Sequence, residues 1–137
     1  FVAVSLEKET HKPFHYLKEL PLSPDAEIQL VHMVTENAKI DGMQFALRFL
    51  SKEEKQKIEE DVTYKLQSLK NELFSPNSKV TTKVLFDSNI RAAFTEYVSK
   101  EKADLVIVAT RARHGFFDSS FAQHQVRYSP ANVLVLR

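Results

Sequence analysis

The sequence predicts an α/β fold in which helices cover both faces of a doubly wound, five-stranded parallel sheet. Short runs rich in Val, Ile and Leu alternate with longer segments whose apolar residues recur every three or four positions. Alternating strands and helices of this kind require parallel strands joined by right-handed crossovers. The 137 residues are long enough for one domain and short for two, so we expect a single domain over residues 1–137.

The first part of the chain is expected to hold two strands with a short helix between them. Residues 1–4 (FVAV) are an unbroken apolar run, which is typical of a strand buried on both faces. Residues 26–34 (AEIQLVHMV) read as the second strand. Pro13 near its start and Pro21 at its end delimit the helix. Residues 35–50 show no clear period and are assigned as a connection.

A long helix is expected to follow. Ser51 and Glu54 have the spacing of a capping box, in which each side chain satisfies a free amide at the start of the helix. The core-facing stripe recurs in steps of four and three: Ile58, Val62, Leu66, Leu69 and Leu73. The polar side is supplied by Lys55, Lys57, Glu59, Glu60, Lys65 and Lys70.

The remaining chain is expected to form three strands and two helices. Residues 79–87 are rich in β-branched and aromatic side chains and read as the third strand. Ser88 then caps a helix. Residues 104–109 (DLVIVA) form the fourth strand, residues 119–129 a short helix, and residues 132–137 (NVLVLR) the fifth strand. The core face of the first of these helices is formed by Ile90, Ala93, Phe94, Tyr97 and Val98.

The most suggestive polar segment is the loop ATRARHGFFDSS, residues 109–120, directly after the fourth strand. In doubly wound sheets ligands lie beyond the carboxyl ends of the strands, where the winding direction switches. Here that rule points to this loop and to Ser5, which follows the first strand. Arg111 and Arg113 can hold a phosphate or carboxylate through charge-assisted hydrogen bonds. The same arginines also suit a solvated loop that pairs with nearby carboxylates.

The amino-acid composition and charge limit the classes of function expected for this protein. A net charge of +1 and dispersed basic residues do not favour nucleic acid, and no apolar stretch reaches the roughly 18 residues of a membrane span. The absence of cysteine removes disulfides and thiolate chemistry. We therefore expect a cytoplasmic protein. The sequence begins without an initiator Met, so membership of a longer protein stays open.

Catalytic and metal sites receive little support from the residue pattern. No Ser-His-Asp set or nucleophile elbow can be nominated, and we expect no enzymatic activity. His11 and His15 have helical spacing, but a zinc site needs a third ligand and the H-E-x-x-H pattern is absent. His32, within an apolar strand, is expected to be a hydrogen-bonded interior histidine, and His124 a surface residue.

The stretch KADLVIVATRARHGFF, followed by VRYSPANVLVLR, resembles the universal stress protein family. Members of that family have an Ala-Asp-Leu strand, a glycine-rich loop, a short helix, a Pro-containing turn and a Val-Leu-Val strand. His32 lies where the family commonly has Leu-His-Val. The resemblance implies the universal stress protein, or adenine nucleotide α hydrolase-like, fold with strand order 3-2-1-4-5. It also implies a possible ATP site in the 109–120 loop.

The departures from the family pattern bear on that ATP site. Ala109 and Ala112 occupy the positions of the first two loop glycines, and Ser5 replaces the family's aspartate. Glycines in such a loop let backbone amides converge on phosphate oxygens, and each added Cβ obstructs that approach. We therefore expect no cofactor and a regulatory module that works through contacts with an unidentified protein partner. The alternative is a sensor that binds ATP, AMP or another small anion at the switch point. Its ligand-binding residues would be Ser5, Met33, Val34, Thr110, Arg111, Arg113, Gly115, Ser119 and Ser120.

Two further expectations concern Met33, Val34 and the last strand. Met33 and Val34 match family positions beside adenine, but core packing at a strand end explains these residues better than a ligand does. The last strand is apolar on both faces and is expected at a sheet edge, where unpaired backbone groups invite another chain. Since family members commonly dimerise through this strand, we expect a twofold-symmetric homodimer through residues Val133 to Leu136.

Overall fold

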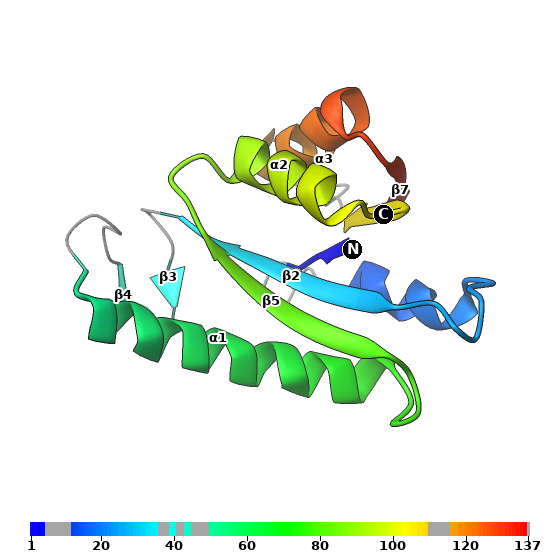
Figure 1. Cartoon of the computed structure of the whole chain (residues 1–137), viewed down its shortest axis with the longest axis horizontal. Coiled ribbons are helices and arrows are strands. Elements are labelled where there is room, and N and C mark those ends of the chain that lie inside the picture. Colours follow the sequence, from blue (N-terminus) through cyan, green and yellow to red (C-terminus); the bar gives the residue numbers. More distant parts are fainter. Residues whose placement is uncertain (5–11, 36–38, 41–42, 45–49, 110–115, 137) are drawn as a thin grey trace.

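The computed structural model describes residues 1–4, 12–35, 39–40, 43–44, 50–109 and 116–136. Its main sheet has five parallel strands in the order β5-β2-β1-β6-β7, which is the predicted order 3-2-1-4-5 (Figure 1). The sheet strands are β1 (Val2–Ala3), β2 (Ile28–Val34), β5 (Val80–Phe86), β6 (Leu105–Ala109) and β7 (Asn132–Leu136). The doubly wound α/β fold expected from the sequence is thus confirmed.

Helices cover both faces of the sheet, and each face has its own apolar core. The 3-10 helix η2 (Lys12–Glu19) and the long helix α1 (Lys52–Leu73) lie on one face. Helices α2 (Ile90–Glu101) and α3 (Phe116–Tyr128) lie on the other, as Figure 1 shows above and below β2 and β5. Because successive side chains of a strand point to opposite faces, each strand contributes to both cores.

Helix α1 forms as the sequence indicates. The Ser51 hydroxyl accepts the Glu54 amide at 3.2 Å, which confirms Ser51 as the N-cap. The Glu54 carboxylate accepts the Ser51 hydroxyl at 3.1 Å, in place of the expected bond to the Ser51 amide. Four residues of the expected stripe are buried and Ile58 is partly buried. Full burial of each leucine contributes roughly 1.5–3 kcal/mol, so packing on the sheet is the main reason this helix is stable. The four buried residues are Val62, Leu66, Leu69 and Leu73.

Two local expectations need correction. The N-cap of α2 is Asn89 rather than Ser88, because the Asn89 carboxamide oxygen accepts the Ala92 amide at 3.3 Å. Asp87 fixes this cap by accepting the Asn89 amide at 2.8 Å. Within residues 35–50, where the sequence pattern predicts only a connection, the structure contains a short antiparallel ladder between β3 (Lys39–Ile40) and β4 (Met43–Gln44).

The end of α2 shows how the chain manages with two glycines. Lys102, its C-cap, adopts a left-handed conformation with φ 53°, where glycine or asparagine is usual. A non-glycine residue in this region costs about 1 kcal/mol. Its amide donates to the Ser99 carbonyl at 3.3 Å, which satisfies one of the free carbonyls at the helix end.

A buried glutamine ties α3 to α2. Gln125 is 0% exposed, and its amide nitrogen donates to the Arg91 carbonyl at 3.3 Å while its oxygen accepts the Thr95 hydroxyl at 3.3 Å. Both of its polar ends are therefore satisfied, as a buried carboxamide requires. This contact fixes the position of α3, the helix that follows the basic loop.

Candidate ligand site at the carboxyl ends of the strands

The carboxyl ends of β1 and β6 lie side by side in the centre of the sheet. The two strands are parallel neighbours, with Val2 opposite Ile107. The winding direction switches here, because β2 and β5 lie beyond β1 while β7 lies beyond β6. The chain therefore leaves both strands at the edge where ligands of doubly wound sheets are found. Five of the nominated site residues lie outside the described residues: Ser5, Thr110, Arg111, Arg113 and Gly115.

Helix α3 begins soon after β6 in the sequence. It starts at Phe116, three residues earlier than the sequence analysis expected, and its backbone includes Ser119 and Ser120. The helix runs for thirteen residues and follows the basic loop directly. Its position agrees with the expected arrangement of strand, loop and helix, although this arrangement does not by itself define a ligand.

Met33 and Val34 at the end of β2 point to opposite faces of the sheet. Val34 is 0% exposed and belongs to the core under α1. Met33 is only partly buried and packs against the core under α2 and α3. Of the two, Met33 is the one that keeps surface a ligand can contact.

His32 links β2 to the last described residue of β1. Its Nδ1 lies 2.8 Å from the Val4 carbonyl oxygen, and since a carbonyl only accepts, this nitrogen carries the hydrogen. Burial lowers the pKa of His32, the hydrogen bond to Val4 opposes that shift, and the nearby Lys65 ammonium adds to it. The expected hydrogen bond of His32 is confirmed, and its side chain is partly buried rather than fully interior. The bond holds in place the residue that precedes Ser5.

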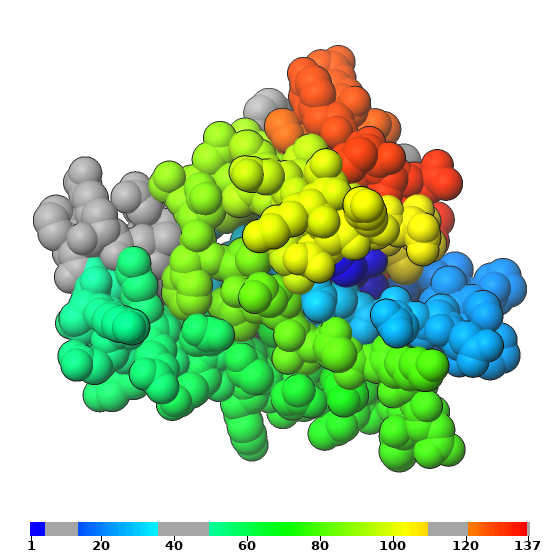
Figure 2. Space-filling model, viewed as in Figure 1, coloured from blue at the N-terminus to red at the C-terminus, as the bar shows by residue number. Residues whose placement is uncertain are grey.

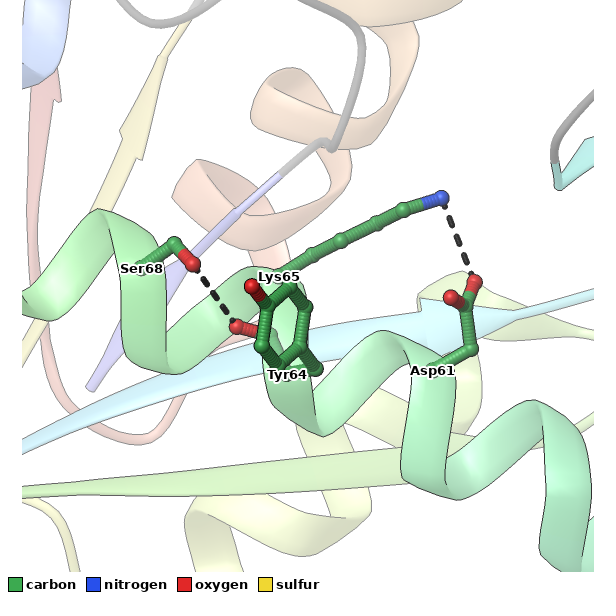
Figure 3. Close-up of polar contacts among 4 residues, drawn as sticks. All are labelled: Asp61, Tyr64, Lys65 and Ser68. Carbon is green, nitrogen blue, oxygen red and sulfur yellow. Dashed lines mark hydrogen bonds and ion pairs between the residues drawn. The ribbon is translucent and has the colours of Figure 1, made fainter.

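Lys65, whose charge acts on His32, forms an ion pair with Asp61 on α1. Figure 3 shows this pair. The Lys65 ammonium is 3.2 Å from Oδ2 of Asp61, and the two side chains are 32% and 38% exposed. Oδ2 is shielded from solvent, and the ammonium provides its electrostatic partner. The sequence analysis had placed Lys65 only on the polar side of α1. Its (i, i+4) spacing from Asp61 was the available signal, but the spacing could not show that both flank the buried stripe.

The outer side of the same turn is solvent-exposed. Figure 3 shows Tyr64 and Ser68 on α1, with the Ser68 hydroxyl donating to the Tyr64 carbonyl at 3.1 Å. The Tyr64 side chain is 74% exposed. These two residues therefore belong to the helix surface, while Lys65 and Asp61 lie closer to the sheet.

His15 and His124, two further histidines that the structure describes, have ordinary contacts. Nε2 of His15 lies 3.6 Å from the Glu72 carboxylate, while His11, at helical spacing from it in sequence, lies outside the described residues. His124 is half-buried rather than fully at the surface, and its ring packs on Tyr128 with centroids 4.7 Å apart. Among the residues that the structure describes, no three His, Cys, Asp or Glu side chains form a group able to hold a metal ion.

None of the helices in the described part of the chain is both long and apolar enough to cross a bilayer. The longest, α1, carries charged residues along its length.

Comparisons with known proteins identify the type of fold. The model of the universal stress protein family matches residues 1–137. UspA, a universal stress protein from Lactobacillus plantarum, is similar in structure, with a TM-score of 0.68 at 14% identity over 99% of this chain and 95% of that one. No curated protein matches this chain.

Two further solved structures are named with a nucleotide. A universal stress protein in complex with cAMP has a TM-score of 0.61 at 11% identity, covering 98% of this chain and 91% of that one. An Arabidopsis thaliana protein of the universal stress protein family with AMP bound has a TM-score of 0.57 at 14% identity, covering 98% and 88%. At these identities the likeness establishes the fold.

Proposed function

Because this chain belongs to the universal stress protein family, we propose that it is a dimeric regulatory module that lacks the usual ATP site and acts through protein contacts. The proposal includes the absence of catalysis. Its cytoplasmic location stays a prediction. The observation that carries the proposal is the chemistry of β7, an edge strand of the sheet.

Within the described residues, strand β7 combines an unpaired backbone edge with apolar side chains. It pairs with β6 on one side and ends the sheet on the other. Its three central residues, Val133, Leu134 and Val135, are only partly buried. Helix α3 packs on the same strand, and its Val126 is 59% exposed. A second copy related by a twofold axis would pair the edge and cover this surface, which supports a homodimer through Val133 to Leu136.

The loss of the ATP site rests on the residues that follow β6. Ala109, the last residue of that strand, and Ala112 stand where the family's loop has glycines. Their methyl groups obstruct the close approach of backbone amides to a triphosphate. The loop keeps Gly115 as its single glycine. A chain with this loop is better suited to signalling through its surfaces than to holding ATP.

A smaller anion at the same place is the second candidate. The solved relatives named with cAMP and AMP favour it, because each carries one phosphate rather than three. In this chain the ligand would meet Met33 at the end of β2 and the residues nominated from the sequence. Lys65 adds a cation near His32 at that end of the sheet.

Native mass spectrometry of the purified chain tests both candidates together. The proposal expects a species of twice the chain mass that carries no ATP, even after incubation with ATP and exchange into volatile buffer. A dimer that retains AMP or cAMP alone would favour the second candidate. A monomer at about ten micromolar, or one retained ATP per chain, would contradict the proposal. Apomyoglobin incubated with the same nucleotides controls for nonspecific adducts.

A further inference from the structure

A cavity of about 520 Å³ opens at the amino ends of β2 and β5, at the opposite end of the sheet from the candidate site. Its walls come from the end of η2, the stretch leading into β2, the last turn of α1 and the turn before β5. Figure 2 shows the blue segment after η2 and the bright green segment after α1 meeting at one end of the molecule. Small-molecule sites usually measure roughly 300–1,000 Å³, so the cavity has a suitable size.

The lining of this cavity is mixed, with apolar side chains beside serines and charged residues. Leu17 and Leu73 are 4% and 2% exposed and belong to the core under α1. Leu20, Ile28 and Phe74 also line it and are only partly buried. A hydrocarbon chain placed here would remove these side chains from water. At about 25 cal/mol per Å², each buried methylene should tighten binding about fourfold.

The rim of the cavity carries two lysines on different walls. Lys18 extends from η2 and Lys79 from the turn before β5, and both side chains are exposed. Within the described part of the chain neither ammonium has a carboxylate partner. The acidic residue of the lining, Glu72, lies 3.6 Å from His15. The cavity therefore offers cations to a ligand that brings its own negative charge.

The end of α1 limits how much negative charge that ligand can carry. Its C-terminal carbonyls place a partial negative charge near Phe74 and Ser75. The turn that follows is closed on itself, because the Ser75 and Ser78 hydroxyls share a hydrogen bond of 3.2 Å. Phosphate groups with two or three charges are disfavoured beside this helix end. A single carboxylate held between two lysines is not disfavoured there.

We propose that this cavity binds a monocarboxylate with a hydrocarbon chain, of the class of a medium-chain fatty acid. The chain lies on Leu20, Ile28 and Phe74, and the carboxylate lies between Lys18 and Lys79. Strand β2 from Ile28 to Val34 separates this cavity from the nucleotide candidate site by roughly 20 Å, at about 3.3 Å per residue. The proposal is therefore independent of whether the other end of the sheet binds a nucleotide.

Calorimetric titration of the whole chain with four probes tests the chemistry. Octanoate, octanol and octylammonium share the same chain length, and decanoate has two more methylenes. We expect decanoate to bind about fifteenfold more tightly than octanoate, from about fourfold per methylene. Octanoate should bind more tightly than octanol, and octylammonium most weakly. Equal affinity for octylammonium and octanoate, or no binding of decanoate at millimolar concentration, would overturn the proposal.

Substitutions at the rim locate the carboxylate. Replacing both lysines, Lys18→Met with Lys79→Met, should weaken decanoate about tenfold or more and leave octanol unchanged, because hydrogen bonds to a charged group are lost. The matched control is Lys57→Met, an exposed lysine of α1 outside the lining. Because both rim lysines are exposed, the fold should be retained, and circular dichroism checks this.

A further substitution tests the cavity without changing the charge of its lining. Ala26→Leu places extra volume in the lining and should abolish decanoate binding. Amide NMR shifts of the unsubstituted protein provide a readout independent of any variant. Decanoate should shift the amides of residues 17–28 and 72–79. Shifts centred instead on the carboxyl ends of β1 and β6 would overturn the assignment to this cavity.

Discussion

The two edges of the sheet, β5 and β7, are built in contrasting ways. Strand β5 carries exposed Thr81 and Lys83 between its buried valines, and the long helix α1 packs along its other face. Strand β7 has no charged residue between Asn132 and Leu136, and its three central apolar side chains remain partly exposed. Lysine on an edge strand discourages pairing with another chain. The β5 edge is therefore protected against association, and the β7 edge is not.

This difference separates two sources of stability. The β5 side depends on contacts within the chain, since α1 contributes four buried residues to the core there. On the β7 side part of the apolar surface stays exposed, and the proposed homodimer would cover it. Substitutions on the β5 side should act on folding itself, while those at β7 should act partly on association.

Leu66→Ala, under α1, is expected to have the largest effect. Leu66 is 0% exposed, so the change leaves a cavity and should lower the free energy of unfolding by about 2–5 kcal/mol. Leu134→Ala on β7, where the side chain is partly buried, should lower it by roughly half as much. Urea unfolding followed by circular dichroism measures both.

Measuring both variants at several protein concentrations makes this test more specific. The loss from Leu134→Ala should shrink as the protein concentration falls, because part of it reflects association. The loss from Leu66→Ala should not change. Equal concentration dependence for the two variants would show that the two sides of the sheet do not differ in this way.

Val135→Lys is expected to have the next largest effect, on assembly. In a twofold interface the new charge appears twice, so the dissociation constant of the dimer should rise on the order of a hundredfold. Thr81→Lys, the same charge on the exposed face of β5, should leave it unchanged. Sedimentation velocity over a range of concentrations gives both constants. Similar effects of the two substitutions would remove the distinction between the edges.

Much of this architecture could be predicted from the sequence because it depends on local patterns. The apolar runs, the stripe of α1 and the Ser51 cap each follow from neighbouring residues, and the strand order follows from the family resemblance. The cap of α2 shows where local reasoning stops. Ser88 and Asn89 are both good capping residues, and the choice depends on Asp87 accepting the Asn89 amide.

The contacts between elements were less predictable. The ion pair of Lys65 with Asp61 was visible as a spacing, but its position beside His32 depends on how α1 lies on the sheet. The cavity at the amino ends of β2 and β5 is formed by two stretches distant in sequence, residues 17–28 and 72–79, and no motif marks it. Of the nominated ligand residues, the structure describes the side chains of Met33 and Val34. The nominations in the loop after β6 stay predictions.

The smallest expected effect concerns pH and the interior beneath α1. Burial lowers the pKa of His32 below its usual value of 6.5, so the unfolded chain binds more protons than the folded one as the pH falls below 6.5. The contribution of His32 to the free energy of unfolding should therefore be fully present above that pH. It should decline toward pH 5, by at most about 1.4 kcal/mol per pH unit.

His32→Asn isolates this contribution, because an Asn amide can still donate to the Val4 carbonyl but does not titrate. Between pH 7 and pH 5, the free energy of unfolding of the variant, measured by urea unfolding, should fall less than that of the unsubstituted protein. Its assembly through β7 should not change, since the histidine lies at the other side of the sheet's centre. If the free energy of unfolding of the variant declined as much as that of the unsubstituted protein, burial under α1 would not be lowering the pKa of His32. The pH dependence would then no longer distinguish the β5 side of the sheet from the β7 side.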